Sequence, residues 1–169
     1  MNEGYSWGGG SGLSAWEAVM WRIEADPHTR STSVFVEVLD REPDWERLVQ
    51  AHIRGSLQVP RLRERIVDPP VPVVTPAWSV DPNFDVDHHL YRIGLPDPGT
   101  WTQLGETVAD VLQRPLDRTR PPWEAVLVTG LEGGKAAYLF KAHHAFADGL
   151  ALVQMLEVRL CNNSSIWTS

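Results

Sequence analysis

The sequence has a single cysteine, Cys161, among 169 residues. One cysteine excludes an internal disulfide framework and a cysteine-based metal site. It is also typical of a protein from a reducing compartment, so we expect a cytoplasmic location. No run approaches the roughly eighteen apolar residues of a transmembrane helix. The glycine- and serine-rich residues 1–12 lack the apolar centre of a secretory signal. Any contact with a membrane is therefore expected to be peripheral.

Positive charge is also scarce, because 15 Lys and Arg residues stand against 22 Asp and Glu residues, for a formal net charge of −7. This balance argues against nonspecific binding to nucleic acid. One local basic cluster is present, and we expect it to be a solvated face, with contact to an anionic cofactor or lipid surface as the alternative: Arg54, Arg61, Arg63 and Arg65. Eight tryptophans are spread along the chain, and we expect them to pack in the core and anchor helices.

Helical and strand patterns alternate along the chain, which predicts a mixed α+β fold with a largely antiparallel component. Ser14 with Glu17, and Thr100 with Gln103, form capping boxes, and Asp44 is a further helix N-cap. The predicted helices are 14–25 (ended by Pro27), one after Asp44 with Trp45, Leu48, Val49, His52 and Ile53 on its buried face, one after Thr100 with Leu104, Val108, Val111 and Leu112 as its apolar stripe, and 149–160. The predicted strands are 32–39, 123–128 and 136–143, with an extended, proline-rich segment at 60–82 and turns at 97–99 and 131–134.

The length suggests one domain, or part of a larger one. Residues 1–12 are expected to be flexible, residues 13–160 to form the domain, and residues 161–169 to be an aberrant tail. The tail begins abruptly after the last predicted helix, so the chain is expected to be cut short. On the face of the second helix, His52 is expected to be a core histidine with satisfied hydrogen bonds, and Lys141 in the last strand is expected to point away from the core.

The pattern H-H-x-x-x-D-G follows the last predicted strand, with His143, His144, Asp148 and Gly149 at its fixed positions. Histidine is the side chain whose ordinary pKa lies near neutrality, so it can accept a proton and return it in one reaction cycle. A titratable pair at the end of a strand, next to a connection to a helix, is a common place for chemistry on a rigid scaffold. The motif therefore indicates an acyltransfer site.

This motif is the signature of the CoA-dependent acyltransferase superfamily, which includes chloramphenicol acetyltransferase and peptide-synthetase condensation domains. Three further segments narrow the resemblance: L-S at 13–14, F-D-V-D-H-H-L at 84–90 with L-P-D-P-G at 95–99, and P-L-D-R-T-R-P-P-W-E at 115–124. Together they resemble the N-terminal half of the bacterial wax ester synthase/diacylglycerol acyltransferase family, from about residue 13 to residue 160. His88 stands where that family usually has an aromatic residue, and Pro122 where it has an aliphatic one.

The resemblance implies the N-terminal half of a chloramphenicol-acetyltransferase-like, two-domain enzyme, with a mixed sheet, flanking helices and a site in a channel between the halves. It implies transfer of a fatty acyl group from acyl-CoA, as co-substrate, to diacylglycerol or a long-chain alcohol. No bound cofactor or metal is implied, and the residues that bind the co-substrate and the oxyanion are not identified. Another chain could supply the absent C-terminal domain, and contact with a membrane or lipid droplet is possible for such substrates.

Each motif position receives a role from this resemblance. His144 matches the family's general base, and His143 packs or orients the site. Asp148 holds the loop, through an arginine such as Arg118 or Arg120, and Gly149 allows close backbone approach and a tight entry to the helix. The charged cluster at 117–120 is either a scaffold near the channel or a self-paired turn.

Three alternatives stay open. His88 and His89, beside Asp85 and Asp87, could suggest a metal site, although the segment fits the family pattern without one. The reaction could be the amide-forming condensation of peptide synthetases, which share the histidine motif. The chain could also be a truncated, non-catalytic fragment.

Overall fold

A computed structural model of the chain describes residues 12–24, 26–71 and 73–146. Its three α-helices are α1 (Ala15–Ile23), α2 (Trp45–Gln58) and α3 (Trp101–Gln113). Each begins at a predicted N-cap, where a side-chain oxygen accepts a backbone N–H that has no partner within the helix. Ser14 and Thr100 form complete capping boxes, and Asp44 accepts from the N–H of Arg47. The sequence therefore identified the start of all three helices.

The larger sheet has four strands in the order β1-β6-β5-β4. Its strands are β1 (Thr32–Leu39), β4 (Leu90–Gly94), β5 (Trp123–Leu131) and β6 (Lys135–His143). Strand β6 is antiparallel to both of its neighbours, whereas β4 and β5 are parallel, so the sheet is mixed. The proline-rich segment supplies a separate antiparallel pair, β2 (Glu64–Val67) with β3 (Ala77–Val80). Four 3₁₀ turns complete the described part: η1 (Pro27–Thr29), η2 (Pro60–Arg63), η3 (Val86–His88) and η4 (Glu132–Gly134).

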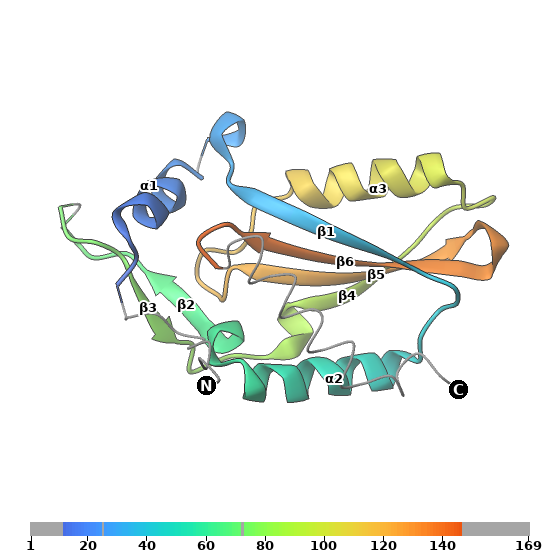
Figure 1. The fold of residues 1–169 in the computed structure, drawn as a ribbon, viewed down its shortest axis with the longest axis horizontal. Coiled ribbons are helices and arrows are strands. Elements are labelled where there is room, and N and C mark those ends of the chain that lie inside the picture. Colours follow the sequence, from blue (N-terminus) through green and yellow to red (C-terminus); the bar gives the residue numbers. More distant parts are fainter. Residues whose placement is uncertain (1–11, 25, 72, 147–169) are drawn as a thin grey trace, which may run out of the picture.

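Helices cover both faces of the four-stranded sheet (Figure 1). Leu104 and Val111 of α3 pack on one face, against Val126, Val128, Ala137 and Leu139. On the other face α2 joins α1 and the β2–β3 pair in a larger cluster, which includes Trp21, Leu48, Ile66, Trp78, Trp123 and Phe140. Figure 1 shows α1 beside the end of the sheet at which β6 stops. His143, the last residue of β6, and His144 lie at that same end.

His52 on the inner face of α2 is a core histidine, as predicted. Its Nδ1 lies 2.8 Å from the carbonyl oxygen of Leu48, and its Nε2 lies 2.9 Å from the hydroxyl of Tyr138. The carbonyl accepts only, so Nδ1 carries the proton and Nε2 accepts from the tyrosine. Both ring nitrogens are therefore committed to structure.

Several predictions of detail are wrong. Helix α1 ends at Ile23, before the predicted 25, and Pro27 opens η1 instead of ending the helix directly. Leu112 is exposed, because the buried stripe of α3 consists of Leu104 and Val111 with Val108 beside them. Two tryptophans are exposed instead of packed in the core: Trp16 and Trp101.

Some predictions fall on residues outside the described part: the flexibility of residues 1–11, the helix at 149–160 and the tail at 161–169. Gly12, at the edge of the described part, forms an isolated bridge with Ala77. No described helix combines the length and the apolar character that crossing a bilayer requires.

Candidate active site

The histidine motif begins at the last residue of β6. The backbone N–H of His143 donates to the carbonyl of Pro122 at 3.1 Å, and the N–H of His144 donates to the carbonyl of Ser31 at 2.7 Å. The pair is therefore bound to the residue that precedes β1 and to the residue that precedes β5. Asp148 and Gly149 lie outside the described residues, so their roles stay predictions.

The imidazole of His143 is buried and closes a short turn. The backbone N–H of Ala145 donates to Nδ1 of His143 at 3.0 Å, and the N–H of Phe146 donates to the His143 carbonyl at 2.8 Å. Because Nδ1 accepts a hydrogen bond, the neutral ring carries its proton on Nε2. This side chain thus sets the backbone conformation on both sides of His144.

Glu24, which follows α1, lies on the other side of the His143 ring. Its Oε2 is 3.5 Å from Nε2 of His143. The same carboxylate accepts from the N–H of Ser31 and from the hydroxyl of Thr32, both at 2.5 Å. Burial lowers the pKa of His143 below its ordinary 6.5, and the charge of Glu24 opposes that shift only in part. His143 is therefore neutral at pH 7.

The side chain of His144 is exposed, in contrast to its neighbour. Its backbone is fixed by Ser31 and by the turn at Ala145, so the ring projects outward from a rigid peptide. Of the two rings, only this one is open to an incoming molecule. The expected division of roles, with His143 orienting and His144 reacting, is compatible with this geometry.

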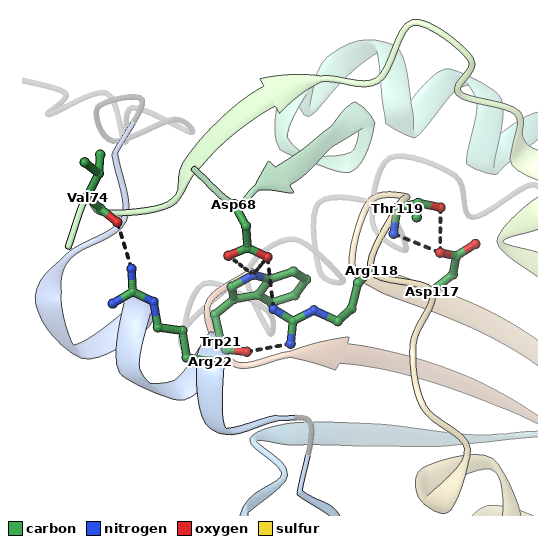
Figure 2. Close-up of polar contacts among 7 residues, drawn as sticks. All are labelled: Trp21, Arg22, Asp68, Val74, Asp117, Arg118 and Thr119. Atoms are coloured by element: carbon green, nitrogen blue, oxygen red, sulfur yellow. Dashed lines mark hydrogen bonds and ion pairs between the residues drawn. The ribbon is translucent and has the colours of Figure 1, made fainter. Parts of the chain in front are cut away.

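The charged block at 117–120 splits into two units. Asp117 forms a self-paired turn, because it accepts from Thr119 and pairs with Nε of Arg120 at 3.2 Å. These contacts lower the pKa of the Asp117 carboxyl, chiefly through the hydrogen bonds from Thr119. Arg118 instead reaches out of the loop to α1 and to Asp68, as Figure 2 shows. The expected contact of Arg118 or Arg120 with Asp148 involves a residue outside the described part and stays a prediction.

Two of the four arginines of the basic cluster, Arg61 and Arg63, lie over aromatic rings, so the cluster is not a purely solvated face. Arg61 stacks over Trp78 at 4.1 Å and pairs with Glu64 at 2.8 Å. Arg63 lies over Phe84, and Arg65 donates to the carbonyl of Thr119. Arg54, on α2, is exposed. The cluster is thus built largely into the surface of the η2–β2 segment.

His89 is buried and belongs to the core. Its ring stacks on Trp123 with centroids 4.5 Å apart, and its Nδ1–H donates to the Trp123 carbonyl at 2.8 Å. Asp85 caps η3 through the N–H of Asp87. Within the described ranges, no three His, Cys, Asp or Glu side chains are placed to share a metal ion.

The prediction that Lys141 points away from the core is wrong, because its side chain is fully buried. Its Nζ donates to the carbonyl of Arg114, just beyond α3, at 2.6 Å and lies 3.5 Å from Oε2 of Glu124. Burial lowers the pKa of Lys141, while the charge of Glu124 opposes the shift. The lysine thus donates to the C-cap residue of α3.

Sequence reasoning missed two residues that contact the His143 ring, Glu24 and Trp21, and a third, Asp68, that contacts Trp21. Trp21 meets the His143 ring edge-on, and Asp68 holds the Trp21 indole. Tertiary folding brings them together from separate elements, and no local spacing in the sequence marks them as neighbours of the motif.

The profile of the wax ester synthase/diacylglycerol acyltransferase catalytic domain matches residues 13–165, most of the chain. The chain belongs to this family. A relative from Mycobacterium tuberculosis, named as a candidate diacylglycerol O-acyltransferase, is 41% identical over 137 residues, which are 81% of this chain and 28% of the relative. A second relative with such a name, from the same species, is 34% identical over 144 residues, covering 82% of this chain and 52% of the relative.

Solved structures of this fold confirm the predicted fold class. The wax ester synthase/diacylglycerol acyltransferase from Marinobacter aquaeolei VT8 matches with a TM-score of 0.70 at 21% identity, over 88% of this chain and 38% of that protein. The starter condensation domain of rhizomide synthetase matches with a TM-score of 0.70 at 14% identity, over 90% of this chain and 39% of that domain. The chain therefore has the fold of the N-terminal half of these proteins, and it spans between about a quarter and a half of the relatives' length.

Proposed function

We propose that this chain forms the general-base half of an O-acyltransferase, which moves a fatty acyl group from acyl-CoA to diacylglycerol or a long-chain alcohol. Membership of the family and the names of its relatives support the substrate classes. The observation that carries the proposal is the contrast within the histidine pair. The ring of His143 is buried and neutral, whereas the ring of His144 is exposed on an anchored peptide.

The proposed chemistry begins with the acceptor alcohol, which is a poor nucleophile while it keeps its proton. The imidazole of His144 takes that proton as the alcohol oxygen bonds to the thioester carbonyl carbon. When the tetrahedral intermediate collapses, the carbon–sulfur bond breaks and the imidazolium returns the proton to the leaving sulfur. A positioned base of this kind contributes about 10²–10⁴-fold in rate.

The complete catalytic unit, as we propose it, includes sequence that corresponds to the rest of the relatives' length. The chain spans 28% of one relative and 38% of the similar wax ester synthase structure. A second segment, from a longer form of this chain or from another chain, would close the channel around His144. Because the substrates are lipids, we also propose peripheral contact with a membrane or lipid droplet.

The test is a free-thiol assay with a long-chain acyl-CoA and either diacylglycerol or hexadecanol. The 169-residue chain is assayed alone and with a separately produced C-terminal half of one of its relatives. We expect His144→Ala to lower CoA release by about 10²–10⁴-fold. The matched control is His88→Ala, another exposed histidine, which should keep the wild-type rate.

Undiminished turnover in His144→Ala would refute the role of this residue. The condensation alternative predicts acyl transfer to an amine on a carrier protein and none to a hydroxyl. The fragment alternative predicts no CoA release, whether the chain is assayed alone or with the C-terminal half. The likeness to the condensation domain is a likeness of fold, and the relatives' names favour a hydroxyl acceptor.

A further inference from the structure

Figure 2 shows three side chains from three distant segments that join one another: Trp21 of α1, Asp68 just after β2 and Arg118 of the loop before β5. Trp21 also contacts the ring of His143. We infer that these residues position His143, and through it the peptide that presents His144. The part that concerns His144 rests on the proposed function. The part that concerns His143 stands on contacts alone and is tested without turnover.

The three side chains form a closed ring of hydrogen bonds. Nη1 of Arg118 donates to the carbonyl of Trp21 at 2.8 Å, and Nη2 donates to Oδ2 of Asp68 at 3.2 Å. The indole N–H of Trp21 donates to the same carboxylate, 3.2 Å from each oxygen. The guanidinium also lies 4.0 Å above the indole ring. Trp21 is thus held at its backbone, its N–H and its ring face.

The position of Trp21 in the helix makes this hold effective. It lies in the last turn of α1, where carbonyls run out of intrahelical donors and the helix dipole favours a cation. Arg118 supplies both the donor and the charge. The end of α1, including the Glu24 that follows it, is therefore tied to the loop that leads into β5.

The Trp21 ring in turn limits the movement of His143. Its indole meets the imidazole edge-to-face, with centroids 5.2 Å apart and planes at 83°. The Ala145 N–H binds one ring nitrogen, and Glu24 faces the other. Rotation of the imidazole would break the bond to Ala145, which shapes the turn that carries His144. The ring contact with Trp21 opposes that rotation.

Stability alone does not explain the arrangement. The side chains of Arg118 and Asp68 are 36% and 50% exposed, and ion pairs at such exposure contribute little to folding because water screens them. Their hydrogen bonds nevertheless join three segments beside His143: α1, the residue that follows β2 and the loop before β5. A role in positioning His143 explains why the three side chains meet at this place, whereas a contribution to stability from a surface ion pair does not.

The experiment is nitrogen-15 NMR of the His143 ring in the 169-residue chain, combined with hydrogen exchange of the Ala145 amide. In the wild type we expect Nδ1 to be unprotonated and Nε2 to carry the proton. In Arg118→Ala the ring should show a mixture of both tautomers, and the Ala145 amide should exchange about tenfold faster as the turn opens. Arg118→Lys keeps the charge but cannot span both acceptors, so we expect it to show the same changes to a smaller degree.

The matched control is Arg92→Ala. Arg92 also lies over an indole, that of Trp45 at 4.6 Å, but belongs to β4. It should leave the His143 signals and the Ala145 exchange rate unchanged. If Arg118→Ala does not fold, Trp21→Phe, which keeps a ring and loses the N–H, and Asp68→Asn give the same readout.

A folded variant of Arg118, Trp21 or Asp68 with wild-type His143 nitrogen shifts and wild-type Ala145 exchange would overturn the inference. Because no substrate is present, this result is independent of the acyl-transfer assay. If the proposed function is wrong, the acyl-transfer assay will show it, and the tautomer of His143 measured by NMR will be unaffected.

Discussion

The backbone N–H of Ala145 donates to Nδ1 of His143, and this hydrogen bond requires that Nδ1 carry no proton. Protonation of the ring would place a hydrogen on Nδ1 and break the bond. The charge of Glu24 and the backbone of Met20 favour protonation of this ring, whereas the charges of Arg118 and His144 oppose it. Burial is the largest influence, and it lowers the pKa. The turn that carries His144 is therefore expected to weaken in acid.

This relationship predicts the pH dependence of stability. In the unfolded chain His143 titrates near its ordinary 6.5, whereas its pKa in the folded protein is lower. Between these values the unfolded chain binds more protons, so the free energy of unfolding rises with pH. The contribution of neutral His143 to the free energy of unfolding is complete above pH 6.5. It is lost as the pH falls through the pKa of His143 in the folded protein.

Urea unfolding between pH 5.5 and 7.5 measures this effect. His143→Asn, whose amide oxygen can accept the Ala145 N–H without titrating, should show a flatter pH profile than the wild type. Some pH dependence should remain in this variant because of His89, since burial also lowers the pKa of that residue. Identical profiles for variant and wild type would show that His143 does not carry the effect.

Replacing Glu24 with Gln should lower the pKa of His143 further, because the carboxylate charge is the main influence that raises it. The amide oxygen can still accept from the N–H of Ser31, and the amide NH2 can donate to the hydroxyl of Thr32, so the local fold is expected to survive. The measurement is an NMR titration of the His143 ring. Glu17→Gln, at the opposite end of α1, serves as control and should leave the titration unchanged. An unchanged or raised pKa in Glu24→Gln would contradict the assigned contact.

The success and failure of the sequence predictions follow from the range of the interactions. Ser14, Asp44 and Thr100 were identified as caps because a cap and its partner lie three residues apart. The contacts of Trp21 with Asp68 and of Arg118 with Trp21 span 47 and 97 residues, and no periodicity encodes them. The sequence therefore reveals the histidine motif, but it does not reveal the contacts that bury His143 and leave His144 exposed.

Lys141 shows a different kind of error. A lysine is rarely buried without a partner, so an outward orientation was expected. Strand alternation instead places it on the same face as Ala137 and Leu139, which pack under α3. The carbonyl of Arg114 and the carboxylate of Glu124 make the burial tolerable. Only the packed structure shows that both acceptors are present.

Lys141→Met is therefore expected to destabilise the protein by about 1–3 kcal/mol, since the Arg114 carbonyl and the partly buried Glu124 carboxylate lose a donor at the buried Nζ. Lys135→Met, on the same strand, removes a lysine that pairs with the fully exposed Asp40 and should have no measurable effect. Thermal or urea unfolding of the two variants gives the comparison. Equal stabilities would mean that the buried lysine contributes no more than the surface one.

Gly99 occupies a turn in which a side chain has no room. Its φ is +71°, and a Cβ there would lie 1.8 Å from the carbonyl oxygen of Gly130. The carbonyl of Gly99 also accepts from the N–H of Glu132 at 2.8 Å, which ties the start of α3 to the β5–β6 connection. Backbone strain alone costs about 1–3 kcal/mol at such a position, and the clash with fixed backbone adds to it.

Gly134→Ala separates these two contributions. Gly134 has nearly the same φ, +72°, but nothing lies within 4 Å of its Cβ position. Its replacement should cost only the conformational part, about 1–2 kcal/mol. Urea unfolding should place Gly99→Ala well below Gly134→Ala in stability, because only Gly99 meets a second backbone strand. Equal losses in the two variants would show that the approach of Gly99 to Gly130 relaxes without cost.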